Sequence, residues 1–386
     1  MSIELYFDHA AGTDLEPAAI GAMHAAAEQG GAHPSAVHRR GRRARAALER
    51  ARGQVAAYLQ CGVDEVWWSH GGTDAVTRAL ELATAQREGP VVVGALEHPA
   101  VRDAVARLAQ RGREVVVVPA ADGQLDPQAL ARALPRAAVV CLAPLNHELG
   151  TVLPWARLQA LAREAWWVVD AAQAAAWMEP APWMTSQAMV TCAAAKLGGP
   201  AGVGALRVPR TVRCGAQAEP SGTPPWLAAI GMGAACEARA PRRGAARERV
   251  VMVAQRLLDG LRAVSPGLLH NGEAAWLGPI VNVAVPGIDG KALQAQLDLR
   301  GVCVARTSAC RQTVDDGSAI VAAAYPQEPA RARSCLRLSL GWSTNNAQVD
   351  AVVEAWRDSL RQLAGDAVNQ DPGSFGSSAA PLDEPG

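Results

Sequence analysis

Short apolar runs recur along the first half of the chain and alternate with segments of helical periodicity. Runs of four to eight residues without polar alternation are typical of strands that are buried on both faces of a parallel sheet. The apolar runs lie at 65–69, 91–94, 114–119, 137–143, 165–172, 188–194 and 203–208. The helical segments lie at 15–29, 42–60, 74–87, 98–110, 126–134 and 155–164. This alternation predicts an α/β domain in which helices connect the strands of a crossover sheet.

The pattern changes after about residue 245. A long amphipathic helix is expected first, then three strands and a closing helix, at 245–263, 281–285, 301–305, 335–340 and 347–364. These elements predict a smaller α+β domain. We therefore expect a large domain at 12–250 and a small domain formed by 1–11 together with 251–366. The Gly-, Ser-, Ala- and Pro-rich tail at 367–386 has little to bury and is expected to be disordered.

Composition excludes several classes of protein. The 37 basic residues balance the 37 acidic ones, so the charge gives no sign of a nucleic-acid or membrane partner. No uncharged apolar stretch approaches the roughly 20 residues that span a bilayer, and no signal peptide is recognisable. None of the eight cysteines forms a CxxC pair, which argues against a structural zinc site or a redox dithiol. We expect a cytoplasmic protein with reduced thiols and no metal.

Lysine is almost absent from this chain. Only Lys196 and Lys291 occur among the 37 basic residues. Lys196 stands between a run of alanines and a Gly/Pro-rich turn. Covalent catalysis by an amine requires lysine, because the guanidinium of arginine does not lose its proton in proteins. An incidental lysine in a surface turn is the alternative that this stretch alone leaves open.

Polar residues follow two of the expected strands, where open α/β sheets bind ligands. The Gly-rich turn at 69–74 precedes a helix, so its backbone N–H groups and Thr73 can hold a phosphate. Asp170 follows the apolar run of Trp166 to Val169, and a carboxylate that emerges from a buried strand needs a positive partner. A protonated pyridine nitrogen or an arginine would serve.

These features belong to a longer series of motifs in a fixed order. They are Asp-His-Ala-Ala-Gly-Thr at 8–13, His-Pro-Ser-Ala-Val-His at 33–38, Gly-Gly-Thr at 71–73, Glu-His at 97–98, Asn-His-Glu-Leu-Gly at 146–150, the lysine segment at 193–204, Ser-Gly-Thr-Pro at 221–224, Ser-Ala-Cys at 308–310 and Arg-Leu-Ser-Leu-Gly at 337–341. The series resembles the cysteine desulfurases of the class V aminotransferase family, over roughly residues 5–365. The resemblance implies the fold type I architecture, with a mixed, mostly parallel sheet in the large domain, and pyridoxal 5'-phosphate (PLP) as cofactor.

The resemblance also implies roles for individual residues. Lys196 would hold the cofactor covalently, and His98 would stack on its ring. Asp170 would pair with the ring nitrogen, and Gln173 would contact the phenolic oxygen of the ring. Its phosphate would lie at Gly72 and Thr73, with Thr223 reaching it from a second subunit, which implies a homodimer. The substrate would meet Asn146, His147 and Arg337, and His147 would also lie beside the cofactor.

The implied reaction takes sulfur from L-cysteine. Lys196 and His98 would move protons while Arg337 holds the carboxylate. Cys310 would receive the sulfur as a persulfide, releasing L-alanine, and a sulfur-acceptor protein would take it further. Two alternatives stay open: a C–S β-lyase or aminotransferase on the same fold, and a non-catalytic homologue that binds a partner.

The chain departs from the family pattern around the expected cofactor. Ala193 and Ala195 stand where the family has serine and histidine, and their loss predicts weaker cofactor binding. Histidines replace the usual asparagine or serine at several positions, of which His147 lies nearest the expected substrate. One hypothesis is that the added histidines rebuild the lost phosphate and substrate contacts from another direction. The alternative is that the activity has weakened or changed.

Overall fold

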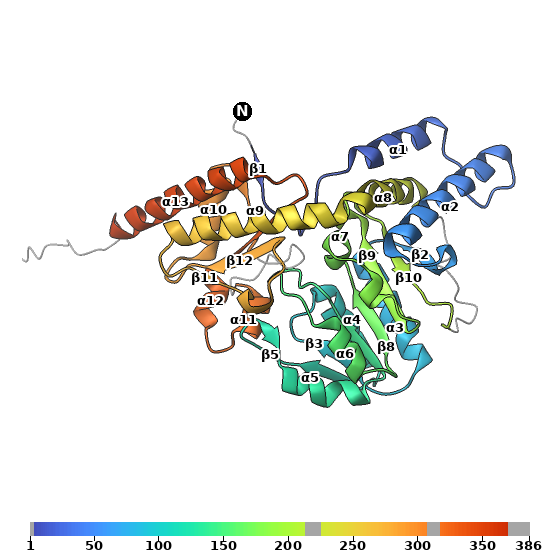
Figure 1. Cartoon of the computed structure of the whole chain (residues 1–386), viewed down its shortest axis with the longest axis horizontal. Coiled ribbons are helices and arrows are strands. Elements are labelled where there is room, and N and C mark those ends of the chain that lie inside the picture. The colour runs from blue at the N-terminus through green and yellow to red at the C-terminus, as the bar shows by residue number, and fades with distance from the viewer. Residues whose placement is uncertain (1–3, 213–224, 307–316, 370–386) are drawn as a thin grey trace, which may run out of the picture.

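A seven-stranded mixed sheet forms the larger half of the molecule (Figure 1). The computed structural model describes residues 4–212, 225–306 and 317–369, with side chains to residue 364. The strand order is β2-β10-β9-β8-β7-β3-β4, and all neighbours are parallel except β10, which is antiparallel to both β2 and β9. The strands are β2 (Val66–Ser69), β3 (Val91–Gly94), β4 (Val115–Val118), β7 (Val139–Leu142), β8 (Trp166–Asp170), β9 (Ala188–Ala193) and β10 (Gly204–Arg207). The expected mostly parallel sheet is confirmed.

Helices cover both faces of this sheet, so successive side chains along a strand pack alternately into two apolar cores. Val91 and Val93 pack with α3 and α4, while Val92 between them packs in the core on the other face. The edge strand β4 is the exception to the expectation of full burial, because Val117 is 57% exposed. The helices of this half are α1 (Pro17–Glu28), α2 (Arg39–Leu59), α3 (Gly72–Gln86), α4 (Pro99–Gln110), α5 (Pro127–Ala133), α6 (Trp155–Leu161), α7 (Ala174–Trp177) and α8 (Trp226–Arg239).

The second half of the molecule is built on a small antiparallel sheet. Its order is β11-β12-β14, formed by Leu269–His270, Ile280–Ala284 and Cys335–Ser339. The N-terminal strand β1 (Leu5–Tyr6) pairs in parallel with β13 (Val302–Cys303) of this half. A hairpin of β5 (Ala120–Ala121) and β6 (Gln124–Leu125) extends from the large sheet toward it. The helices are α9 (Arg243–Val264), α10 (Gly290–Asp298), α11 (Ala319–Ala324), α12 (Pro329–Ser334) and α13 (Asn346–Asn369).

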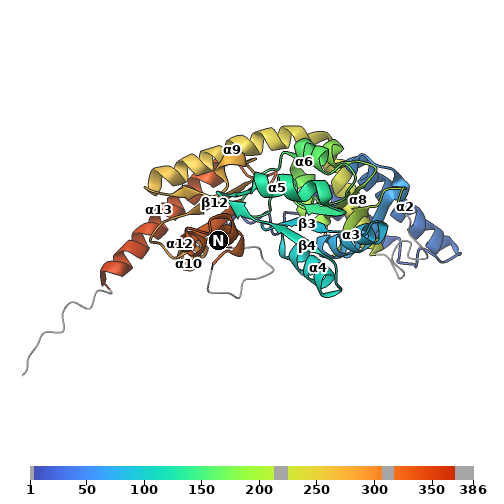
Figure 2. The same cartoon turned by 90° about the horizontal axis from the view of Figure 1, so that it is seen from below.

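The long helix α9 runs along both halves, as Figures 1 and 2 show from two sides. The boundary expected at residue 250 falls inside it, and α13, which packs against α9, reaches Asn369. The domain limits stay a prediction, and residues 370–386 of the expected tail lie outside the described residues. No described helix combines the length and the apolar character that crossing a membrane requires.

Candidate active site

A cavity of about 250 Å³ lies at the carboxyl ends of β7, β8 and β9 and at the starts of α3 and α4. The small half closes one end of it with a side chain from β14. Eight of the residues expected from the sequence line this cavity: Gly72, Thr73, His98, His147, Asp170, Gln173, Lys196 and Arg337. The folded chain therefore brings together residues from six separate motifs.

Lys196 ends a short 3₁₀ turn that directly follows β9. Its Nζ donates a hydrogen bond to the carbonyl of Ala11. The backbone on either side is held by the N-terminal segment: the N–H of Thr13 donates to Ala195 at 2.9 Å, and that of Glu16 to Gly198 at 2.8 Å. The small residues around the lysine allow this close approach, so the amine is delivered from a fixed backbone.

Asp170 is the last residue of β8 and is 7% exposed. Its Oδ1 accepts hydrogen bonds from the N–H of Ala172 at 3.1 Å and from the hydroxyl of Thr191 at 3.3 Å. These donors stabilise a buried carboxylate at the cavity wall. Behind it, burial and the charge of Asp170 raise the pKa of Glu97 well above its usual range. Glu97 is therefore expected to keep its proton to a higher pH than an exposed glutamate does.

Two imidazoles lie together at the cavity. The rings of His98 and His147 make an edge-to-face contact, with centroids 4.8 Å apart and an interplanar angle of 75°. Nδ1 of His98 accepts from the N–H of Ala100 at 3.1 Å and caps α4, which places the proton of the neutral ring on Nε2. Burial lowers the pKa of His98, and burial together with the His98, Arg337 and Lys196 charges lowers that of His147 much further. Both rings are expected to be neutral near pH 7.

The N-terminus of α3 lies at the cavity with the backbone N–H groups of its first turn. Gly71, at a φ of +106°, turns the chain into the helix, and Gly72 and Thr73 follow it. The N–H groups of a first helical turn have no partner within the helix and favour an anion. Ala193 faces this turn, since a Cβ placed on Gly72 would lie 3.5 Å from its methyl group. Both Ala193 and Ala195 line the cavity with carbon alone.

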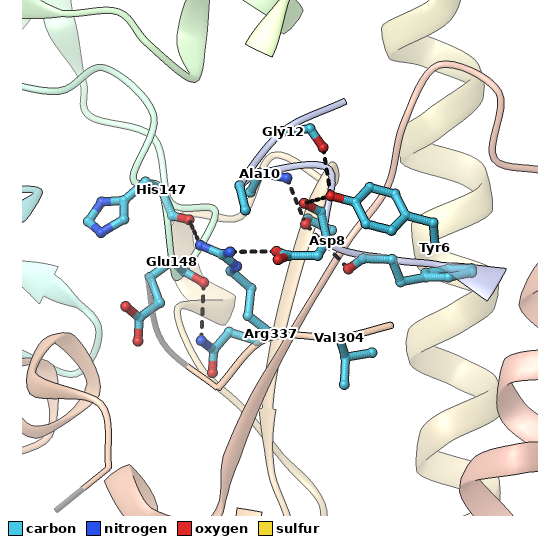
Figure 3. Close-up of polar contacts among 12 residues, drawn as sticks. Tyr6, Asp8, Ala10, Gly12, His147, Glu148, Val304 and Arg337 are labelled. Atoms are coloured by element: carbon cyan, nitrogen blue, oxygen red, sulfur yellow. Dashed lines mark hydrogen bonds and ion pairs between the residues drawn. The ribbon is translucent and has the colours of Figure 1, made fainter. Parts of the chain in front are cut away.

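Arg337, from β14 of the small half, lines the cavity, and Figure 3 shows its polar contacts. Its side chain is 2% exposed. Nη2 donates to Oδ1 of Asp8 at 2.7 Å, and Nη1 donates to the carbonyl of His147 at 3.0 Å. Asp8 is a member of this site to which the sequence assigned no role, although, like Asp170, it is an acid that closely follows an apolar strand.

Three of the expected site residues are not seen at the cavity. The amide of Asn146 binds backbone groups: Nδ2 donates to Leu96 at 2.8 Å, and Oδ1 accepts from the N–H groups of Glu148 and Leu149. Its expected contact with substrate stays a prediction, for which these bonds offer no support. Cys310 and Thr223 lie outside the described residues. Sulfur acceptance and the contribution of a second subunit therefore stay predictions as well.

Comparison with known proteins identifies the family of the chain. The model of the family described as Aminotransferase class-V matches residues 5–220 and 216–352. The chain belongs to the class V aminotransferase family. An IscS-like cysteine desulfurase of Mycobacterium tuberculosis is 34% identical to it over 372 residues, which cover 90% of this chain and 94% of the relative. A cysteine desulfurase of Bradyrhizobium diazoefficiens is 31% identical over 93% of this chain and 95% of the relative.

Solved structures agree on the fold. A NifS-like protein superposes with a TM-score of 0.83 at 22% identity, covering 93% of this chain and all, 100%, of the other. The cysteine desulfurase CsdA of Escherichia coli gives a TM-score of 0.77 at 21% identity, over 93% and 95%. The expected fold type I architecture is thereby confirmed.

PLP is the general cofactor of this family, and the chemistry of the cavity fits it. A lysine amine can bind an aldehyde, a buried carboxylate suits a protonated pyridine nitrogen, and the start of α3 suits a phosphate. Lys196, Asp170 and the turn at 71–73 supply these groups on one cavity. The fit is incomplete at Ala193 and Ala195, whose methyl side chains offer no hydrogen bond.

Proposed function

We propose that the chain is a PLP-dependent cysteine desulfurase, which transfers sulfur from L-cysteine to Cys310 and releases L-alanine. The single observation that carries the proposal is the convergence of Lys196, Asp170, His98 and Arg337 on one cavity. The names of its relatives, at 34% and 31% identity over most of the chain, support the same reaction. Bound PLP would withdraw electrons from the amino acid Cα when its proton leaves.

The residues around the cavity divide the work of binding. Lys196 would hold the cofactor, Asp170 would pair with its ring nitrogen, and the start of α3 would bind its phosphate. Gln173 is anchored at the cavity by its Nε2, which donates to the carbonyl of Ala10 at 2.8 Å, and its side chain would meet the cofactor ring there. Arg337 would bind the substrate carboxylate, which fixes the orientation of the amino acid and selects the Cα bond that breaks.

Proton transfer needs one base and one acid. The amine of Lys196, once exchanged for that of the substrate, would take the Cα proton. Neutral His98 carries its proton on Nε2 because Nδ1 is occupied by the N–H of Ala100, so it is suited to donate first. The Cys310 thiolate would attack the sulfur of the substrate. The S–S bond of a persulfide forms, the C–S bond breaks, and the carbon gains a proton to give alanine.

The wider setting is part of the same proposal. A homodimer is expected, because Thr223 resembles the residue that reaches the phosphate of the neighbouring subunit. A sulfur-acceptor protein would take the persulfide sulfur. The cytoplasm suits a chain whose cysteines work as thiols, and the six described cysteines are all free.

The test is incubation of the purified protein with L-cysteine and a thiol reductant, which releases the persulfide sulfur as sulfide, with sulfide, alanine and pyruvate assayed together. Equal amounts of alanine and sulfide support desulfuration, and pyruvate indicates a C–S β-lyase. A Lys196→Ala variant should lose both the visible absorbance of the cofactor and turnover. A Cys310→Ala variant that releases sulfide at the wild-type rate would exclude the persulfide step. A protein that takes up no added PLP would overturn the proposal.

A further inference from the structure

The guanidinium expected to receive the substrate carboxylate already holds a carboxylate of the chain itself. Figure 3 shows Arg337 between Asp8 and His147. Its Nη2 is 2.7 Å from Oδ1 of Asp8, and the two side chains are 2% and 20% exposed. A buried guanidinium is strongly destabilised without a counter-charge. Asp8 supplies that charge before any ligand is present.

Arg337 does not depend on Asp8 for its position. On one side its backbone pairs with Asn282 of β12, and on the other it exchanges two hydrogen bonds with Ala305, of 2.6 and 3.1 Å. The guanidinium itself is held by Nη1, which donates to the carbonyl of His147 at 3.0 Å. Removal of the Asp8 charge should therefore leave the arginine in place.

The backbone of Asp8 is fixed while its side chain has a path to solvent. Its carbonyl accepts from the hydroxyl of Tyr6 at 3.1 Å and from the N–H of Ala11 at 3.0 Å. Asp8 also forms a parallel bridge to Ser339. With the main chain held on both sides and the side chain one-fifth exposed, rotation of the side chain is the accessible movement.

We propose that Asp8 is an internal competitor that sets the affinity of the site for the carboxylate of its amino-acid substrate. In the ligand-free protein Asp8 neutralises the charge of Arg337, so this end of the cavity attracts an anion weakly. The substrate carboxylate takes its place on the guanidinium, and Asp8 turns toward solvent. The inference rests on the proposed function only in taking an amino acid as the ligand of Arg337.

The test compares ligands that differ by one charge. Binding of L-alanine and of L-alaninamide to the PLP-loaded protein is measured by calorimetry, for the wild type and for Asp8→Asn. Asparagine keeps the size of the side chain and removes the charge. We expect L-alanine to bind about tenfold more tightly to the variant, a coupling of ordinary size between neighbouring sites. L-Alaninamide, which has no carboxylate, should bind equally to both proteins.

Two further variants complete the test. Asp8→Glu keeps the charge, so it should not show the gain, and Asp8→Ser should show it if Asp8→Asn does not fold. Weaker or unchanged binding of L-alanine in the neutral variants would overturn the proposal and make Asp8 an orienting residue. An equal gain for L-alaninamide would overturn it too. The binding ratio is independent of turnover, so absence of sulfide from L-cysteine would count against the proposed reaction alone.

Discussion

Restoring one hydroxyl at the cavity should strengthen cofactor binding by a calculable amount. Ala193 is the last residue of β9, and its methyl group faces the first turn of α3. The Ala193→Ser substitution would place a donor beside the N–H groups that are expected to bind the phosphate of PLP. A hydrogen bond to a charged group contributes about 1.5–3 kcal/mol. The dissociation constant for PLP should therefore fall by a factor of about 10 to 150.

The measurement is a titration of the cofactor-free protein with PLP, followed by absorbance, for the wild type and Ala193→Ser. Pyridoxal, which lacks the phosphate, is the matched control ligand and should bind both proteins alike. Ala193→Val is the matched control variant, because it adds bulk without a donor and should not strengthen binding. Unchanged affinity for PLP, or an equal gain for pyridoxal, would show that the phosphate does not lie at the start of α3.

Three further predictions concern stability, each measured by chemical denaturation. Burial lowers the pKa of His270 to about 4, and neither ring nitrogen has a partner among the described residues. The ring takes up its proton near pH 6.5 in the unfolded chain, so its contribution to the free energy of unfolding is fully present above that pH and is lost as the pH falls toward 4. By pH 5 the loss reaches at most about 2 kcal/mol, and it should be absent in His270→Phe. In Gly341→Ala the added methyl group would collide with the His9 ring, so the substitution should lower the free energy of unfolding by roughly 1–3 kcal/mol. The double variant that also carries His9→Ala should recover part of this loss. Glu65 forms an ion pair of 2.7 Å with Arg207, and the Arg207 and Glu65 side chains are 8% and 11% exposed, so Glu65→Gln should cost about 3 kcal/mol. Asp64→Asn is the matched control: the Arg210 and Asp64 side chains are 69% and 61% exposed, so its effect should be much smaller.

Hydrophobic patterning predicted the large sheet well because its strands are buried on both faces. The run at 91–94 coincides with β3, and the other six are each within two residues of the observed strand ends. Strand direction was beyond this pattern: β10 is buried like its neighbours, yet it runs antiparallel to both. An apolar run indicates that a strand is buried, whereas the direction of the strand depends on the connections before and after it.

Elements of the second half were harder to predict because they are short. Strand β13 has two residues, and helices α11 and α12 have six each. Periodicity cannot be read reliably over one and a half turns. The helix α8 was missed for another reason: it is buried on nearly all sides and consists largely of alanine and glycine, so it has no clear apolar stripe.

Motifs located the residues of the site but not the bonds between them. Asp170 and Lys196 lie at the cavity as their strand-end positions indicate. The ion pair of Arg337 with Asp8 joins residues 329 positions apart, and no local pattern contains it. The motif of Asn146 suggests a ligand contact, which stays a prediction; the structure adds the backbone bonds that its amide makes, which the motif did not contain.

His147 explains how the chain can differ from its relatives here without losing the carboxylate-binding end of the cavity. Its ring contacts His98, while its backbone carbonyl, not its side chain, receives the hydrogen bond from Arg337. A change of side chain at this position alters the surroundings of the His98 imidazole and leaves the support of the guanidinium in place. Under the proposed function, the exchange of asparagine for histidine would act on proton transfer and on the cofactor ring, whereas carboxylate affinity would be set separately, at Asp8.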